Sequence, residues 1–342
     1  MRPYARPLLL VVLVTACAAV GSETLPGQPA HHVEGGFRNT DPAVQRASGG
    51  DRFKFMWSRA WAAARPSDVP RMANDGAALR ANGSSPTVTW IGHATMLVQL
   101  QGTNLLTDPH WGERASPLSW AGPKRLQPPG LAFEDLPPIH VVLISHDHYD
   151  HLDIGTVKRL AADHDPVFVV PLGLKAWLEA QGISRVVELD WWGSFEHRGL
   201  RIVCTPAQHF SQRGLWDSNT RLWASWAVVG TGRRFYFSGD TGYFDGFREI
   251  GKRLGPFDLT AMAIGAYMPP SIMRFIHLTP EEAVQAHQDL GGATLVGVHW
   301  GTFDLAEEPL DEPPARMLAE ASRRALPPEH AWILKLGETR GW

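Results

Sequence analysis

In this chain of 342 residues, six consecutive positions read His146-Asp147-His148-Tyr149-Asp150-His151 and so bring together three imidazoles and two carboxylates. They follow an apolar run, residues 141–144, whose shortness and β-branched composition predict a buried strand. His146 and His148 are two positions apart, so an extended backbone directs both side chains to the same side. Imidazole and carboxylate suit zinc and similar divalent cations. The stretch therefore predicts a metal site in the turn after a buried strand, rather than a solvated loop.

Other predicted strands are also followed closely by a metal-capable side chain. These are 199–206, followed by His209; 234–239, followed by Asp240; and 293–298, followed by His299. Because rigid strands commonly hold functional groups at their ends while the loops vary, this repetition indicates a single site at one rim of a sheet.

The seven candidate ligands divide into two groups. His146, His148 and His209 would hold one ion, and Asp150, His151 and His299 would hold the other. Asp240 can bridge the two ions because a carboxylate offers two oxygens. Two dications about 3.5–4 Å apart activate a water at neutral pH and stabilise the oxygens of a displacement reaction. We therefore predict a binuclear hydrolase in which Asp150 and Asp240 also take part in catalysis.

Two further polar residues lie at predicted strand boundaries. His93 follows Gly92, and Asp108 follows the short strand expected at 104–107. Each is either a hydrogen-bonded core residue or a partner that orients a metal-bound imidazole. Both interpretations are open at this stage.

Composition limits the remaining possibilities. The chain is 44% hydrophobic and 20% charged, which is typical of a folded body with a sizeable core, in one large domain or two modest ones. The net charge of −3 gives no support for binding nucleic acid or for attraction to an anionic membrane surface. The two cysteines lie far apart, which excludes a disulfide framework.

The N-terminus reads as a lipoprotein leader. Arg2 and Arg6 precede the apolar run 8–14, which is too short to span a bilayer. The run ends in Val-Thr-Ala-Cys17, a lipobox-like sequence that predicts removal of residues 1–16 and lipidation of Cys17; a plain secretory signal is the alternative. Residues 17–50, rich in Gly, Pro, Ser and Ala, are expected to form a flexible tether to a body at 51–342. The expected location is the bacterial cell envelope, at the outer membrane if the cell has one.

Several longer motifs carry a family resemblance. They are Trp90-Ile91-Gly92-His93-Ala94-Thr95, Gly122-Pro123-Lys124-Arg125, Leu189-Asp190-Trp191-Trp192, Gly239-Asp240-Thr241-Gly242-Tyr243, Gly255-Pro256-Phe257-Asp258-Leu259 and Val298-His299-Trp300-Gly301-Thr302-Phe303. With His-x-His-x-Asp-His at 146–151, the chain resembles the metallo-β-lactamase superfamily. From about residue 53 to 314 it is similar to the N-acylphosphatidylethanolamine-hydrolysing phospholipase D branch. Two departures are the lipoprotein leader and Asp147, where those relatives are expected to have Asn.

The resemblance implies an α/β fold, an αβ/βα sandwich of two mixed β-sheets flanked by helices, with the metal site at one edge. It also implies two zinc ions bound through the seven positions given above, with His277 near the substrate phosphate and Tyr149 lining the site. From the residues alone, the apolar segment 271–276, which contains Arg274, is expected either to pack in the interior or to form a loop that touches acyl chains, with Arg274 on a phosphate.

The expected reaction is hydrolysis of a phosphodiester in a membrane phospholipid. The expected substrate is N-acylphosphatidylethanolamine, and the products are N-acylethanolamine and phosphatidic acid. His277 would either assist the leaving oxygen or bind the phosphate. The alternatives are a metal-dependent lactonase, another phosphodiesterase, or a lipoprotein that binds zinc without catalysis. The expected partners are the phospholipid and a membrane reached through the anchor on Cys17. The apolar segment 53–61 would pack on the body, contact lipid or form a homodimer interface.

Overall fold

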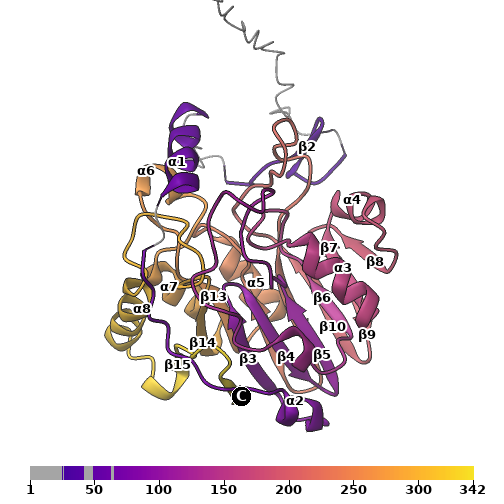
Figure 1. Cartoon of the computed structure of the whole chain (residues 1–342). Coiled ribbons are helices and arrows are strands. Elements are labelled where there is room, and N and C mark those ends of the chain that lie inside the picture. Colours follow the sequence, from indigo (N-terminus) through magenta and orange to yellow (C-terminus); the bar gives the residue numbers. More distant parts are fainter. Residues whose placement is uncertain (1–24, 26, 42–48, 63–64) are drawn as a thin grey trace, which may run out of the picture.

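Two β-sheets lie face to face at the centre of the protein, with helices on the outer face of each (Figure 1). The computed structural model describes residues 25, 27–41, 49–62 and 65–342. The predicted leader and Cys17 lie outside the described residues. The order of layers is helix, sheet, sheet, helix, and the predicted αβ/βα sandwich is confirmed.

The first sheet comes mainly from the N-terminal half of the chain. In spatial order its strands are β16 (Thr339–Gly341), β3 (Thr87–Gly92), β4 (Thr95–Leu100), β5 (Thr103–Thr107), β6 (Val141–Leu143), β7 (Val167–Pro171) and β8 (Val186–Leu189). Strands from β16 to β5 pair antiparallel, and those from β5 to β8 pair parallel. The sheet is therefore mixed, as predicted.

The second sheet repeats this plan. Its strands are, in spatial order, β15 (Ala331–Trp332), β14 (Gly292–Val298), β13 (Phe257–Ala263), β12 (Arg234–Phe237), β11 (Ser225–Val229), β10 (Leu200–Thr205) and β9 (Ser194–His197). Pairing is antiparallel from β9 to β12 and parallel from β12 to β15. The loops after β6, β10, β12 and β14 carry the predicted metal ligands.

The helices and the short elements complete the layers. They are α1 (Gly49–Trp61), α2 (Ala77–Ala81), α3 (Ile154–Asp163), α4 (Leu174–Ala180), α5 (Gly246–Leu254), α6 (Pro270–Met273), α7 (Pro280–Asp289), α8 (Glu312–Arg323), the 3-10 turns η1 (Phe133–Asp135) and η2 (Pro328–His330), and the small hairpin β1 (His32–Val33) and β2 (Gly36–Phe37). Among the described helices, none combines the length and the apolar character needed to cross a membrane.

Alternation along the strands builds the two sides of the core. In β6, Val141 and Leu143 join the cluster between the sheets, while Val142 joins the cluster beneath α3 and α4. Successive strand residues point to opposite faces, so a strand covered on both sides must be apolar throughout. Each fully buried aliphatic or aromatic side chain contributes about 1.5–3 kcal/mol. This packing fixes the end of β6, where the histidine motif begins.

The N-terminal segment departs from the prediction of a flexible tether. Residues 27–41 include the β1–β2 hairpin, and the Phe37 amide donates to the Asn219 carbonyl at 2.9 Å. The Asn39 side chain bonds both the backbone oxygen and the backbone nitrogen of His209, at 2.9 and 3.1 Å. The tether prediction is therefore wrong over this stretch. Its Gly- and Pro-rich composition suits turns as well as linkers, and contacts with distant residues hold it on the body.

Candidate metal centre

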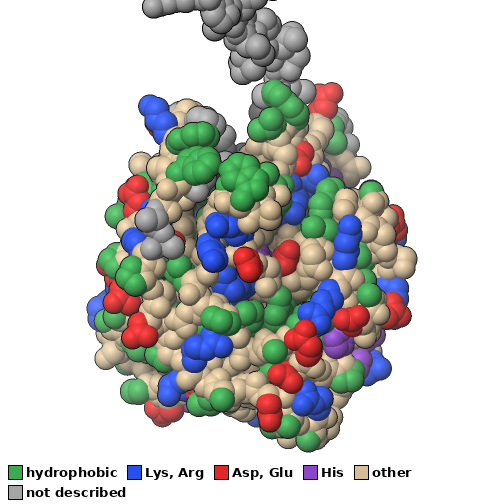
Figure 2. All heavy atoms as spheres, in the orientation of Figure 1, with side chains coloured by type: hydrophobic (Ala, Val, Ile, Leu, Met, Phe, Trp, Pro, Cys, Tyr) green, Lys and Arg blue, Asp and Glu red, His purple; other side chains and the backbone are tan. Residues whose placement is uncertain are grey.

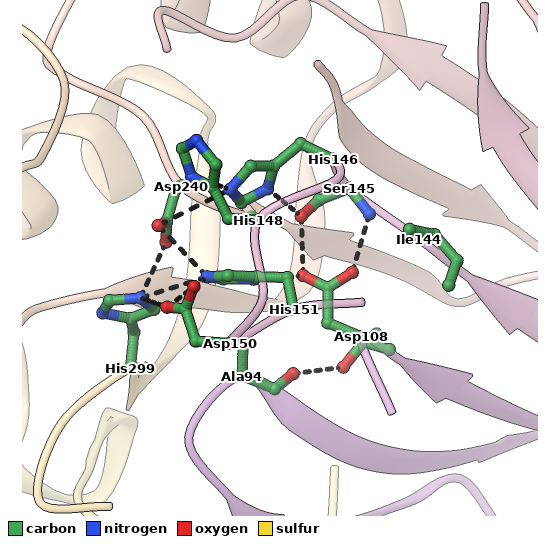
Figure 3. A network of polar contacts seen from close by, with 12 residues as sticks. Ala94, Asp108, Ile144, Ser145, His146, His148, Asp150, His151, Asp240 and His299 are labelled. Carbon is green, nitrogen blue, oxygen red and sulfur yellow. Dashed lines mark hydrogen bonds and ion pairs between the residues drawn. The ribbon is translucent and has the colours of Figure 1, made fainter. Parts of the chain in front are cut away.

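Side chains from four strand ends converge at one rim of the sandwich, as Figure 3 shows for most of them. The turn after β6 supplies the histidine motif, and the segments after β10, β12 and β14 supply His209, Asp240 and His299. Both sheets therefore contribute to the centre, and all seven predicted ligands fall within two adjoining groups of metal-capable side chains. The structure therefore brings these side chains together at one rim, as expected from the sequence.

The first group consists of His146, His148, His209 and Asp240. The His148 Nδ1 atom lies 2.8 Å from His146 Nε2 and 3.2 Å from His209 Nε2. The Asp240 Oδ2 atom is 3.9 Å from His146 Nε2 and 3.8 Å from His209 Nε2. Ligands at the zinc–nitrogen distance of 2.0–2.1 Å in a tetrahedron lie roughly 3.3 Å from each other. The group therefore has nearly the spacing of a coordination shell.

The second group consists of Asp150, His151, His299 and His93. The His151 and His299 Nε2 atoms are 3.1 Å apart, and Asp150 Oδ2 lies 3.3 and 3.4 Å from them. Asp240 reaches this group as well, with Oδ2 3.1 Å from His151 Nε2 and Oδ1 3.1 Å from His299 Nε2. Its carboxylate thus lies between the two groups, in the position predicted for a bridging ligand.

Hydrogen bonds on the outer side of the rings fix their orientation. The Nδ1 atoms of His146 and His209 lie 2.9 Å from Ser145 Oγ and 2.7 Å from the Ile276 carbonyl oxygen. The Nδ1 atom of His151 lies 2.7 Å from Asp108 Oδ2. A ring that donates from Nδ1 keeps the lone pair of Nε2 available to a cation. The network therefore presents these Nε2 atoms to the centre.

Asp108 is a fully buried carboxylate with several partners. It accepts from the Ser145 amide at 2.7 Å, from Ser145 Oγ at 2.6 Å and from His151 (Figure 3). Burial raises the pKa of Asp108, and these contacts oppose that shift. The sequence left two interpretations of Asp108 open. Its position beside the His151 ring is that of a partner that orients this imidazole. His93 differs from Asp108 because it is itself a member of the second group. Its Nε2 atom lies 2.9 Å from Asp150 Oδ2.

The electrostatics of the two groups differ. Burial lowers the pKa of His148 and of His209 to about 3, so both rings are neutral near pH 7. Burial also lowers the pKa of His299, but Asp240 and Asp150 outweigh it and raise that pKa to about 9. The two carboxylates therefore attract positive charge to the second group. A divalent cation supplies such charge and competes with protons for the same nitrogens.

The backbone is strained around the centre. His93, Asp108 and His299 have φ angles of 53°, 34° and 62°, in the left-handed region. Such conformations cost of order 1–3 kcal/mol each and persist where the surroundings enforce them, often at functional sites. Gly239, just before Asp240, has a φ of 53°, and a Cβ there would lie 2.5 Å from the Ser145 Cβ. Glycine is required at this point so that Asp240 can reach the motif.

The predicted substrate residues lie in different surroundings. His277 is buried, and its Nδ1 atom lies 3.8 Å from Asp240 Oδ2 without a hydrogen-bond partner among the described residues. The Tyr149 hydroxyl donates to the Arg213 carbonyl at 3.0 Å, and the Arg213 guanidinium lies over its ring. Arg274 is exposed, with its guanidinium 5.7 Å from the Phe275 ring. Only His277 of these three has a described contact with the two groups.

The sequence did not reveal the contacts that some residues around the centre make. Ser145 joins Asp108 to His146, and Phe210 packs its ring 4.4 Å from the His148 ring. Asp147, predicted as a mild change within the motif, forms a buried ion pair with Arg221 at 2.7 Å. The only available hint was that these residues adjoin predicted ligands. Their partners are set by the folded chain.

The residues fit a metal cofactor. The His277 Nδ1 atom is buried and lacks a hydrogen-bond partner among the described residues, and the buried Asp240 Oδ1 atom has no hydrogen bond of good geometry although His299 Nε2 lies 3.1 Å away. Leaving such atoms unsatisfied costs about 1–3 kcal/mol each, and more for a charged group. A cation held by either group would satisfy the carboxylate, and the donor set of imidazoles and carboxylates suits zinc and similar divalent cations.

Comparison with known proteins identifies the family. Residues 103–300 match the model of the beta-lactamase superfamily domain, so the chain belongs to the metallo-β-lactamase superfamily. With the sequence relatives below, it falls in the N-acylphosphatidylethanolamine-hydrolysing phospholipase D-like branch, and it is a metal-dependent hydrolase.

The relatives differ in how much of each chain is matched. An uncharacterized protein of Mycobacterium tuberculosis is 43% identical over 95% of this chain and 88% of its own length. The N-acyl-phosphatidylethanolamine-hydrolyzing phospholipase D 1 of Caenorhabditis elegans is 50% identical over 64% of each chain. The structure of Igni18, a metallo hydrolase of Ignicoccus hospitalis, has a TM-score of 0.58 and 21% identity, over 76% of this chain and 99% of that one. This structural likeness concerns the fold alone.

Asp240 contacts both groups, whereas His209 belongs to the first group alone. Substituting either residue should remove metal while the protein stays folded. We expect Asp240→Asn and His209→Ala each to lose bound metal and to reduce turnover by more than about 100-fold, beyond the loss typical of an outer partner. Elemental analysis of the purified variants measures the metal. His330→Ala is the matched control, because that ring bonds Thr294 away from the centre. Near-wild-type metal content and activity in either variant would contradict the assigned centre.

Asp108 allows a test of the outer hydrogen bonds. Asp108→Asn keeps the shape of the side chain but removes its charge, so it should weaken metal affinity by about 10–100-fold. Competition with a chromogenic chelator measures the affinity. Asp163→Asn, on the surface of α3, provides the same chemical change as a control. A folded Asp108→Asn protein with unchanged affinity would show that Asp108 has no orienting role.

Proposed function

We propose that this protein is a binuclear zinc hydrolase that cleaves a phosphodiester of a membrane phospholipid. The substrate that we propose is N-acylphosphatidylethanolamine, which would give N-acylethanolamine and phosphatidic acid. The observation that carries the proposal is the buried Asp240 carboxylate between two groups of imidazoles. A relative that is 50% identical over 64% of the chain, and is named for this reaction, supports the choice of substrate.

Two zinc ions, when bound, would supply an activated water and Lewis acidity for the phosphoryl oxygens. The chain's own groups divide the remaining work. Asp240 holds the two groups together, while Asp108 and Ser145 keep His151 and His146 oriented. His277 places an unsatisfied Nδ1 atom beside Asp240, where it can donate a hydrogen bond to the phosphate or to the leaving oxygen. Burial lowers the pKa of His277 to about 3, which favours a neutral ring that donates a hydrogen bond.

An aromatic surface formed by α1 and by Trp120, in the loop between β5 and η1, supports the proposal that the substrate lies in a membrane. Trp57, Trp61 and Trp120 are 59%, 57% and 66% exposed, and their rings form a continuous group with centroids 5.8 and 6.2 Å apart. Figure 2 shows hydrophobic side chains gathered at the end of the molecule where α1 lies. Exposed tryptophans suit the boundary between lipid headgroups and acyl chains. We call these three residues the tryptophan patch.

The tryptophan patch is linked to the metal centre through α1. Phe55 of α1 belongs to the same apolar cluster as Phe210, whose ring contacts His148. Arg59 and Arg65 both pair with Asp304, the residue after Phe303, and the Phe303 ring contacts His93. A protein resting on a bilayer through the tryptophan patch would thus hold the centre near the lipid surface.

The cellular setting is part of the proposal. A lipid anchor on Cys17 would hold the enzyme at a bacterial envelope membrane, where its substrate is concentrated. A homodimer through the apolar surface of α1 stays an alternative use of the same residues. Neither prediction depends on the chemistry at Asp240.

Product analysis tests the substrate. We expect N-acylphosphatidylethanolamine in mixed vesicles to yield N-acylethanolamine and phosphatidic acid, identified by mass spectrometry, with the reaction abolished by chelator and restored by zinc. Homoserine lactones and cyclic nucleotides serve as parallel substrates. Faster zinc-dependent turnover of a lactone or a cyclic nucleotide would assign another hydrolase activity. No turnover of any of them by zinc-loaded protein would favour a protein that only binds metal.

The tryptophan patch gives a separate prediction. Trp57→Ala with Trp61→Ala should weaken vesicle binding by at least about tenfold, because each indole buries roughly 150–250 Å². Hydrolysis of a short soluble phosphodiester should change little. Leu318→Ala, an exposed apolar residue of α8, is the control. Unchanged vesicle binding together with a shift from dimer to monomer in solution would assign the patch to a subunit interface.

A further inference from the structure

A second arrangement of metal-capable side chains lies outside the centre, where the N-terminal hairpin meets the body. It consists of His31, His32 and Asp190. The His31 Nε2 atom lies 2.7 Å from Asp190 Oδ1, and the His32 Nε2 atom lies 2.8 Å from Asp190 Oδ2. His32 begins β1, and Asp190 directly follows β8. Two imidazole nitrogens therefore meet one carboxylate across 158 and 159 residues of chain.

The three side chains are held in place by their surroundings. His31 is 5% exposed, and its ring stacks on Trp191 with centroids 4.2 Å apart. The Trp191 amide donates to Asp190 Oδ1 at 2.8 Å, which fixes the carboxylate. The Phe37 ring meets His32 edge-on at 5.2 Å and His31 in a stacked arrangement at 6.4 Å. The ligand atoms are thus positioned before any ion arrives, which reduces the entropy cost of binding.

We propose that His31, His32 and Asp190 form a third metal site, for a single divalent cation of the zinc class. Two neutral imidazoles and a carboxylate are a common zinc ligand set, and all three donor atoms lie within 4.8 Å of one another. The Asp190 side chain is 29% exposed and that of His32 19%, so an ion and a coordinating water can enter from solvent. The hydrogen-bonded rings already direct the nitrogens that would bind the ion.

The site has a structural role in the fold. An ion at this position would join the segment 31–32 to the end of β8 and so fasten the β1–β2 hairpin to the body. Two residues beyond β2, Asn39 bonds both backbone groups of His209 and the Trp223 indole nitrogen. The third site would therefore fasten the segment that carries Asn39, while the Asn39 hydrogen bonds to His209 form without the ion. It would not contact substrate.

Glutamine substitutions distinguish a metal site from simple hydrogen bonding. His32→Gln keeps a donor that can reach Asp190 but removes the imidazole ligand. We expect elemental analysis to give one zinc equivalent less in His32→Gln than in the full-length wild-type protein, with hydrolysis of a soluble phosphodiester retained. The same loss should appear in an Asp240→Asn background, where the main centre is impaired. His330→Gln is the matched control and should lose no metal.

A measurement on the wild-type protein needs no variant. Diethylpyrocarbonate modifies accessible imidazoles, and peptide mass spectrometry reads the modification of His32 with and without added zinc. Zinc should protect His32, and Asp190→Asn should abolish that protection. Equal zinc content in wild type and His32→Gln, or modification of wild-type His32 that zinc does not change, would overturn the proposal and leave a hydrogen-bonded pair. Either result is independent of whether the main centre cleaves phospholipid.

Discussion

Burial of carboxylates beside imidazoles is the constraint on which this structure depends. Asp108 and Asp240 are almost completely removed from solvent, and isolated buried charges of this kind cost several kcal/mol each. The protein compensates by surrounding them with hydrogen-bond donors and histidines from both sheets, which places the strand ends within a few ångströms of one another. The left-handed conformations of His93, Asp108 and His299 follow from the same requirement, because each aims a side chain at this region.

The sequence predicted the centre better than its surroundings. The ligands could be found because each follows a strand with a clear apolar pattern, and strand ends meet at a rim whatever the details of packing. The αβ/βα sandwich followed from the family resemblance. Asn39, Asp190 and Arg221 could not be found in this way. Their partners are 170, 159 and 74 residues distant, and such pairings depend on packing that local patterns do not encode. The N-terminal hairpin was mistaken for a linker because turns and linkers share Gly and Pro.

Asp147 shows how a position inside a metal motif can serve the loops instead. It accepts from the Gln212 amide at 2.9 Å and pairs with Arg221, while Arg213 donates to the Asp147 carbonyl at 2.7 Å. The segment after His209 is thereby held against the motif. One side of the motif turn faces the two groups of metal-capable side chains, and the other carries a network that fixes the neighbouring loop.

The pairing of β16 with β3 means that the first sheet is completed only late in synthesis. The first sheet gains its edge strand only from Thr339–Gly341, about 250 residues after β3 leaves the ribosome. Until then β3 presents open backbone groups, the kind of edge that invites pairing with other chains. The nascent molecule therefore cannot close its first sheet while its carboxyl end is still being made. Truncation at that end would leave a product prone to aggregation.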